Sequence, residues 1–158
     1  MENRLNIHEQ GQTALKSLNG LGMYLSKSSI EKNLLHLIYF RVSQINGCAY
    51  CLDMHSKDLL EAGEDTKRLF VLDAWREASF YNERERAGLA WAEALTKLNG
   101  NAVPYDIYAE ALEQFGEKDL IDLTIAVIAI NSYNRVNLAF PQPQMVGTYV
   151  PGMFAHAK

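Results

Sequence analysis

Helical spacing of apolar residues along nearly the whole chain is the feature that most limits its fold. Between residues 30 and 45, leucine and isoleucine recur three, four and seven positions apart, which is the spacing of one face of an α-helix. No alternation of strand-like and helix-like segments interrupts this pattern. We therefore predict an all-α protein. Its 158 residues fit a single domain, residues 1–158, with about six to seven helices.

Breaks rich in glycine and asparagine mark the ends of the predicted helices. Asn46 and Gly47 form the strongest break, so one helix ends there and the next begins at Cys48 and runs back antiparallel to it. The predicted helices cover about residues 5–18, 30–45, 48–61, 66–75, 83–98, 105–115 and 117–138. The last stretch, residues 139–158, contains three prolines and two glycines, and we predict an irregular tail there.

The composition excludes several classes of protein. Charged residues make up 22% and apolar residues 48% of the chain, as in ordinary globular proteins. The formal net charge of -4 gives no basic surface for nucleic acid or for an anionic membrane. No apolar run reaches the roughly 18 residues of a membrane span. The first four residues also lack the apolar stretch of a signal peptide, so we predict a cytoplasmic protein.

The two cysteines of the chain, Cys48 and Cys51, carry the clearest chemical signal. On a helix that begins at Cys48, Cys51 lies about 60° and His55 about 20° around the axis from the first sulfur. All three side chains therefore share one helix face. In a cytosolic protein such a cysteine pair is more often catalytic or metal-binding than a structural staple.

The spacing of these residues favours thiol chemistry. A pair at i and i+3 closes a disulfide only under constraint, so the bond should be readily reduced. The helix N-terminus favours a thiolate, but its field of about 0.3–1 kcal/mol lowers a thiol pKa by only a few tenths of a unit. His55, one turn after Cys51, is therefore the base that we expect to activate the thiol, directly or through one water.

His36 is a second candidate partner of the thiols. It precedes Asn46 by ten residues, and His55 follows Gly47 by eight. At about 1.5 Å per residue, the two histidines lie roughly 15 and 12 Å from the turn. In an antiparallel pair of helices they therefore lie level with each other.

The segment from Ser43 to His55 contains the pattern G-C-x-x-C-x-x-x-H and resembles the AhpD-like alkylhydroperoxidase core of the carboxymuconolactone decarboxylase family. The resemblance is most specific over residues 34–95. It implies an all-helical fold and a homo-oligomer, often a trimer or hexamer, without a cofactor or bound metal. It also implies a thiol-dependent peroxidase that reduces hydroperoxides through a dithiol–disulfide cycle.

The resemblance also implies roles for individual residues. Cys51 would be the peroxidatic thiol, Cys48 the resolving thiol and His55 the histidine of a proton relay. The helix field alone would instead make Cys48 the more acidic thiol, but the base beside Cys51 outweighs that small effect. The implied reductant is a dithiol, such as a lipoyl group or a peroxiredoxin partner.

Two positions depart from the family pattern. His36 stands twelve residues before Cys48, where the relay has a glutamate. An imidazole there can pass a proton but supplies no fixed negative charge to orient His55. Tyr50 stands where the better-known peroxidase has a histidine. Decarboxylase members of the family lack the cysteine pair, so the resemblance disfavours decarboxylation.

Three alternatives stay open on the sequence alone. Cys48, Cys51, His55 and His36 together offer two thiolates and two imidazoles, a set that suits tetrahedral zinc. A non-catalytic helical oligomer could use the cysteine pair as a redox sensor. A thioredoxin-like oxidoreductase is a weaker third reading, because the strands of that fold are missing.

Overall fold

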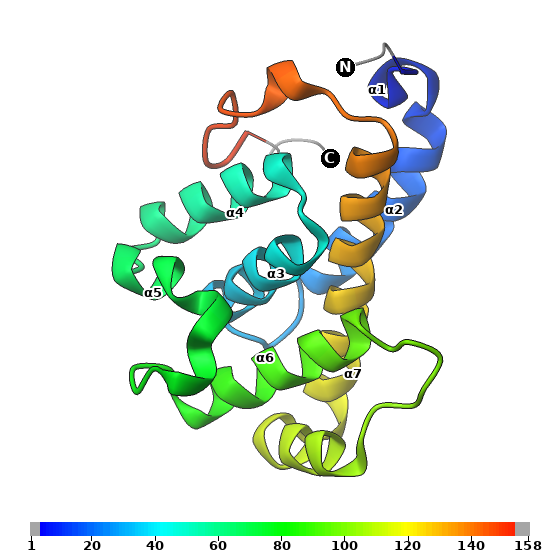
Figure 1. Cartoon of the computed structure of the whole chain (residues 1–158). Helices are drawn as coiled ribbons and strands as arrows, with labels where there is room; N and C mark the ends of the chain where they lie inside the picture. Colours follow the sequence, from blue (N-terminus) through cyan, green and yellow to red (C-terminus); the bar gives the residue numbers. More distant parts are fainter. Residues whose placement is uncertain (1–3, 154–158) are drawn as a thin grey trace.

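The computed structural model describes residues 4–153, and over that range the chain is all-helical (Figure 1). Seven α-helices, two short 3-10 helices and no strand are found in this part of the chain, which confirms the predicted fold class. No helix within it combines the length and the apolar character that crossing a membrane requires. The elements are α1 (Ile7–Gln10), α2 (Gln12–Leu25), α3 (Lys32–Asn46), α4 (Ala49–Glu61), α5 (Thr66–Phe70), η1 (Leu72–Glu77), α6 (Glu83–Thr96), α7 (Tyr105–Ala139) and η2 (Pro143–Met145).

Helix α3 lies at the centre of the molecule, where it packs against α4, α6 and α7 (Figure 1). Ile38 and Val42 on this helix are fully buried. Full burial of one such side chain is worth roughly 1.5–3 kcal/mol. Packing on several sides therefore makes α3 a fixed support for the side chains that it presents to α4.

The turn between α3 and α4 places the cysteine pair. Gly47 ends α3 with a φ of 71°, in the left-handed region that glycine adopts easily. Cys48 is the extended N-cap residue, and α4 begins at Ala49, one residue later than we predicted. Helix α4 then runs back along α3, as predicted, and Cys51 lies in its first turn.

The N-terminal helix differs from the prediction. We expected one helix over residues 5–18 that ends at Asn19 and Gly20. Instead the chain breaks at Gly11 into α1 and α2, and α2 continues to Leu25. Packing of α2 against α7 outweighs the poor intrinsic helix propensity of glycine, which costs about 1 kcal/mol per residue.

The boundary predicted near residue 116 is present inside α7. Gly116 has a φ of 69° and ψ of 173°, so the backbone is not helical there. The kink separates residues 105–115 from residues 117–139, close to the two helices predicted over these ranges. A capping box at the start of α6 similarly fixes that helix, because the Asn82 side chain accepts from the Glu85 backbone and the Glu85 side chain accepts from the Asn82 backbone.

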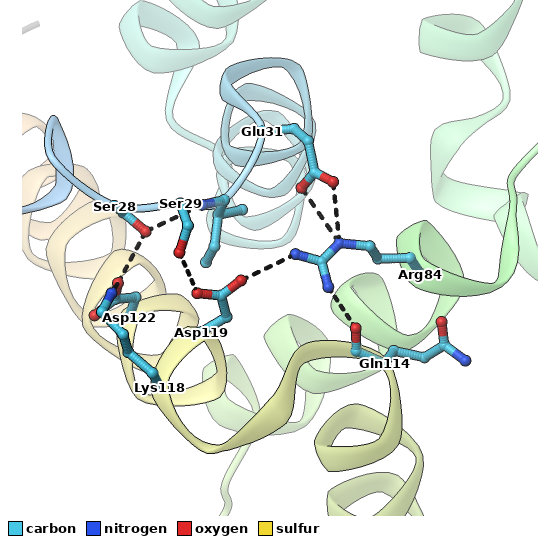
Figure 2. Close-up of polar contacts among 9 residues, drawn as sticks. Ser28, Ser29, Glu31, Arg84, Gln114, Lys118, Asp119 and Asp122 are labelled. Atoms are coloured by element: carbon cyan, nitrogen blue, oxygen red, sulfur yellow. Dashed lines mark hydrogen bonds and ion pairs between the residues drawn. The ribbon is translucent and has the colours of Figure 1, made fainter.

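A polar cluster on α7 holds the segment between α2 and α3 in place (Figure 2). The buried carboxylate of Asp122 accepts hydrogen bonds from Tyr24 (2.6 Å), Ser28 (2.9 Å) and Lys118 (2.8 Å). Figure 2 also shows Asp119, which lies beside Asp122 and accepts a hydrogen bond of 2.5 Å from Ser29. Helix α2 is therefore anchored along α7, where both helices form one wall of the cavity described below.

The segment after α7 folds back onto α4. The Lys57 ammonium donates to the carbonyl oxygens of Gly147 (3.1 Å) and Tyr149 (3.0 Å). The Gly147 amide in turn donates to Asp53 at 3.0 Å. Within the stretch predicted to be an irregular tail, residues 140–153 contain only η2 and turns, and residues 154–158 lie outside the described residues.

Candidate active site

The two cysteines are joined to each other as a disulfide. Their Cα atoms are 5.4 Å apart, inside the usual range of about 4.4–6.8 Å. Both side chains are buried, with at most 1% of their surface exposed. Any reagent must therefore reach the sulfurs through cavities rather than from open solvent.

A cavity of about 380 Å³ lies beside Cys51. His55 lines the same cavity, so the peroxidatic candidate and its predicted base face one space. The remaining wall is largely apolar and aromatic, with side chains from α2, α3, α4 and α7 that include Leu25, Tyr39, Tyr50, Met54, Ile130 and Val136. Such a cavity suits a molecule that carries an apolar group.

The other sulfur borders a different cavity. Cys48 lines a space of about 200 Å³ together with Gly47 and with residues 141–143, 145 and 146 of the segment after α7. Only Cys51, and not Cys48, lines the larger cavity. The disulfide therefore presents one sulfur to each cavity.

Asn137 on α7 contacts the Cys51 sulfur directly. Its side-chain amide donates to the Cys51 sulfur over 3.3 Å. A donor in this position stabilises negative charge on sulfur, and so favours a thiolate or a sulfenate. The sequence analysis missed this residue, because 86 positions separate the two partners and no local motif links them.

The two histidines lie level with each other, as predicted. The Nδ1 atoms of His36 and His55 are 3.3 Å apart, so one ring donates to the other. His55 is buried, whereas the His36 side chain keeps 31% of its surface exposed. The pair therefore links the buried cavity to a position that solvent reaches.

Asp58 supplies the negative charge that position 36 lacks. Its Oδ2 atom lies 3.5 Å from His36 Nδ1 and 4.0 Å from His55 Nδ1. Its other oxygen, Oδ1, accepts a hydrogen bond of 2.7 Å from the Tyr149 hydroxyl. The sequence analysis did not single out Asp58, although its spacing of three from His55 places both side chains on one face of α4.

The surroundings keep both imidazoles neutral. Burial, with a smaller contribution from His36, lowers the pKa of His55 to about 3. Burial also lowers the pKa of His36, against the opposing effect of Asp58. A neutral His55 can accept the proton of a thiol, and the negative charge that then forms on sulfur stabilises the imidazolium.

One nitrogen of His55 stays available for that task. Its Nδ1 faces His36, while its buried Nε2 has no hydrogen-bond partner among the described residues. Because the ring lines the cavity beside Cys51, Nε2 is the atom that can exchange a proton with the thiol or with a bound molecule.

The four-residue zinc set considered from the sequence is not available in this oxidised state, because its two sulfurs form a disulfide. Among the described residues, the ligand atoms that lie within 4.8 Å of one another belong to His36, His55 and Asp58. Neither cysteine belongs to this group. Its third member is a carboxylate, whereas the alternative set has the two sulfurs.

Comparison with known proteins identifies relatives that match most of the chain. The pattern of the carboxymuconolactone decarboxylase family matches residues 10–94. The uncharacterized protein YdfG of Bacillus subtilis (strain 168) is 36% identical over 139 residues, which cover 88% of this chain and 95% of that protein. The uncharacterized protein YnjA of Escherichia coli (strain K12) is 24% identical over 117 residues, which cover 74% of this chain and 64% of that protein.

Two solved structures share the fold. ATU0492 from Agrobacterium tumefaciens, a protein of unknown function described as a candidate antioxidant defence protein AhpD, superposes with a TM-score of 0.84 at 34% identity. The match covers 89% of this chain and 97% of ATU0492. An uncharacterized peroxidase-related protein from Silicibacter sp. TM1040 has the same fold, with a TM-score of 0.71 at 24% identity over 84% of this chain and 72% of its own.

The family pattern spans more than half of the chain, and YdfG and ATU0492 match most of its length. Both the sequence and the fold therefore show that this protein belongs to the carboxymuconolactone decarboxylase family and has an AhpD-like core.

Proposed function

We propose that the protein is a thiol-dependent peroxidase that reduces organic hydroperoxides through Cys48 and Cys51. The observation that carries this proposal is a disulfide with one sulfur on a largely apolar cavity that His55 also lines. The relationship to ATU0492, which is described as a candidate antioxidant defence protein, supports the same chemistry.

The reaction begins with loss of the Cys51 thiol proton to His55. The thiolate attacks the terminal oxygen of the hydroperoxide, the O–O bond breaks, and sulfur is oxidised to a sulfenic acid. The alkoxide that leaves takes the proton from His55 and becomes an alcohol. The amide of Asn137 stabilises the negative charge on the Cys51 sulfur before this step.

The second step closes the disulfide. Cys48 attacks the sulfenic sulfur of Cys51, and the displaced hydroxide leaves as water with the proton of the Cys48 thiol. An external dithiol then reduces the disulfide by exchange and is itself oxidised to a disulfide. The net reaction converts one hydroperoxide and one dithiol into an alcohol, a water and a disulfide.

His36 and Asp58 support the proton transfer in this scheme. Proton acceptance makes His55 cationic in a buried site, and the carboxylate of Asp58 offsets that cost. His36 hydrogen-bonds to His55 and is half-exposed, so it can return protons to solvent. The cluster thus fills the role for which the family pattern has a glutamate.

The partners of the reaction remain proposals. A lipoyl group or a peroxiredoxin partner is the kind of dithiol that the family resemblance implies. We also retain the predicted trimer or hexamer and the cytoplasmic location. Exposed apolar side chains on α2 and α7 support self-association, since Met23, Ile121 and Ile128 are 68%, 61% and 48% exposed in the single chain.

Single-turnover oxidation of the reduced protein tests the proposal. Reduced protein is mixed with cumene hydroperoxide, and the alcohol formed and the state of each cysteine are measured by chromatography and mass spectrometry. We expect one alcohol per disulfide in the wild type. Cys48→Ser should instead accumulate a sulfenic acid on residue 51, which a dimedone trap labels.

Cys51→Ser distinguishes this reaction from the alternatives. This variant should form no alcohol above the rate of the protein-free mixture. Full turnover in Cys51→Ser would overturn the assignment of the peroxidatic thiol. Reversible oxidation of the wild type without any alcohol from several hydroperoxides would support the redox-sensing alternative instead.

A further inference from the structure

The cluster of His36, His55 and Asp58 has the composition and shape of a metal site. Two imidazole nitrogens and one carboxylate oxygen converge within 4.8 Å of one another, and they come from the packed helices α3 and α4. Imidazole and carboxylate are both zinc ligands, and three protein ligands with a fourth position left for water are typical of open zinc sites.

Two of the three distances between the ligand atoms are close to those around a tetrahedral ion, and the third is longer. Ligands at 2.0–2.1 Å from tetrahedral zinc lie about 3.3–3.4 Å from each other. The two Nδ1 atoms are 3.3 Å apart, and Asp58 Oδ2 lies 3.5 Å from His36 Nδ1 and 4.0 Å from His55 Nδ1. The 3.3 Å between the two Nδ1 atoms is a hydrogen bond in this structure, and it also equals the separation that two ligands of one tetrahedral ion would have.

The surroundings also resemble those of a metal site. The Tyr149 hydroxyl donates to Asp58 Oδ1 at 2.7 Å, which leaves Oδ2 directed at the two rings. Partners of this kind fix the orientation of metal-binding carboxylates and are commonly needed for full affinity. The half-exposed His36 and the partly exposed Asp58 give an ion a route from solvent to the buried His55.

We propose that His36 Nδ1, His55 Nδ1 and Asp58 bind one divalent transition-metal ion, with zinc as the ion that this ligand set fits best. The site needs no cysteine, and so it is distinct from the four-residue set derived from the sequence. It also stands independently of the peroxidase proposal, because the ligands converge while the disulfide is closed.

Zinc binding would slow the proposed peroxidase reaction. An ion on both Nδ1 atoms breaks the bond between the histidines and occupies the carboxylate that compensates charge on His55. Metal-bound protein should therefore oxidise Cys51 more slowly than metal-free protein. This consequence, unlike the site itself, rests on the proposed function.

Cobalt titration of the oxidised protein tests the site directly. With the disulfide closed there is no thiolate to bind metal, so the ligands can come only from other side chains. Chelator-treated protein is titrated with Co²⁺, and the visible absorption bands of tetrahedral cobalt are followed. We expect one equivalent to bind, without a sulfur-to-cobalt charge-transfer band, and Zn²⁺ to displace it.

Variants assign the ligands. His36→Asn, His55→Asn and Asp58→Asn should each weaken binding by at least the 10- to 100-fold that changes around a ligand commonly cause. His8→Asn is the matched control, because His8 is exposed and lies outside the cluster; it should bind as the wild type does. Circular dichroism checks that each variant is folded, and the half-exposed His36 is the position least expected to disturb folding.

Two results would overturn the proposal. One is the absence of tetrahedral cobalt bands from the oxidised wild type at a large excess of metal. The other is wild-type affinity in both His36→Asn and Asp58→Asn, which would place the metal elsewhere. Peroxidase activity does not enter either measurement, so failure of the metal site and failure of the proposed function are distinguishable.

Discussion

Asn137 is the side chain whose hydrogen bond reaches the sulfur of Cys51, the proposed peroxidatic residue. It donates to Cys51 from α7, whereas the other site residues lie on α3 and α4. A hydrogen bond to a charged group is typically worth about 1.5–3 kcal/mol. This single donor thus has a larger expected effect on a Cys51 thiolate than the field of the α4 N-terminus, which is worth about 0.3–1 kcal/mol.

Replacement of Asn137 tests how strongly its amide stabilises a thiolate at Cys51. Asn137→Leu keeps the approximate size of the side chain but removes the donor, so the Cys51 thiolate loses its partner. In a Cys48→Ser background, the pH midpoint of Cys51 alkylation by iodoacetamide should rise, and the alkylation rate at neutral pH should fall by about 10-fold or more. Ser132→Ala on the same helix should leave the midpoint unchanged. An unaltered midpoint in Asn137→Leu would contradict the role assigned to the amide.

At the level of secondary-structure elements, the turn at Gly47 decides whether α3 and α4 bring their histidines together. The residue adopts a φ of 71°, and no atom lies within 4 Å of the point where a Cβ would stand. Alanine at this position would therefore suffer from backbone strain alone and not from a clash. The turn requires a positive φ at this position, and any residue other than glycine adopts it at a cost in free energy.

Gly47→Ala should lower the free energy of unfolding by about 1–2 kcal/mol, the cost of the left-handed conformation for a residue with a Cβ. Urea denaturation measures this loss, and the slope of the transition should stay unchanged. Gly20→Ala is the matched control, because Gly20 also has open space around it but lies inside helix α2. That substitution should stabilise the protein by roughly 0.5–1 kcal/mol. Equal effects of the two substitutions would contradict the argument from conformation.

The helix pair also shows how far the sequence predicts the site. Counting residues from the Asn46-Gly47 break was enough to place His36 level with His55, because helix geometry has a fixed rise per residue. The same counting would have found Asp58, three residues after His55. Asn137 and Tyr149 could not be found in this way, since they reach the site from positions 86 and 91 residues away. Such contacts depend on how α7 and the segment after it pack, which no local pattern encodes.

The length of α2 was mispredicted for a related reason. The local signal at Asn19 and Gly20 favours a helix end, but α2 continues and packs against α7. The packing of α2 against α7 therefore outweighs the low intrinsic helix propensity at Asn19 and Gly20. At Gly116, by contrast, the local signal and the tertiary structure agree, and the predicted break is present.

On the scale of the whole molecule, two buried carboxylates connect elements that are distant in sequence. Asp122 joins α7 to the segment before α3, and Glu93 on α6 accepts hydrogen bonds from Arg41 on α3 (2.7 Å) and from Trp75 (3.0 Å) and Arg76 (2.7 Å) on η1. Burial alone would raise the pKa of both carboxyls. The hydrogen bonds outweigh burial, and the pKa of each lies below its ordinary value.

The sign of the resulting pH dependence follows from these lowered pKa values. The folded protein holds each carboxyl ionised to a lower pH than the unfolded chain does, so the unfolded chain binds more protons in the acid range. The stabilisation from Glu93 is therefore complete above its unfolded pKa, about 4.5, and is lost as the pH falls through the lower folded value. Asp122 behaves in the same way, starting from an unfolded pKa of 3.8.

Glu93→Gln tests this linkage. At neutral pH we expect the variant to unfold with a free energy about 2–3 kcal/mol lower than the wild type, somewhat below the 3–5 kcal/mol of a fully buried pair, because Arg76 is 55% exposed. The difference should shrink as the pH is lowered from about 4.5 toward 3, since the wild type then loses the charge that the variant never had. Urea denaturation of both proteins at each pH gives this difference directly. The titration of the histidines affects both proteins equally, so it does not contribute to the difference.

Glu77→Gln, an exposed change on η1, is the control and should stay within about 0.5 kcal/mol of the wild type at every pH. A difference between wild type and Glu93→Gln that stays constant or grows on acidification would mean that Glu93 does not hold α3, η1 and α6 together through its charge.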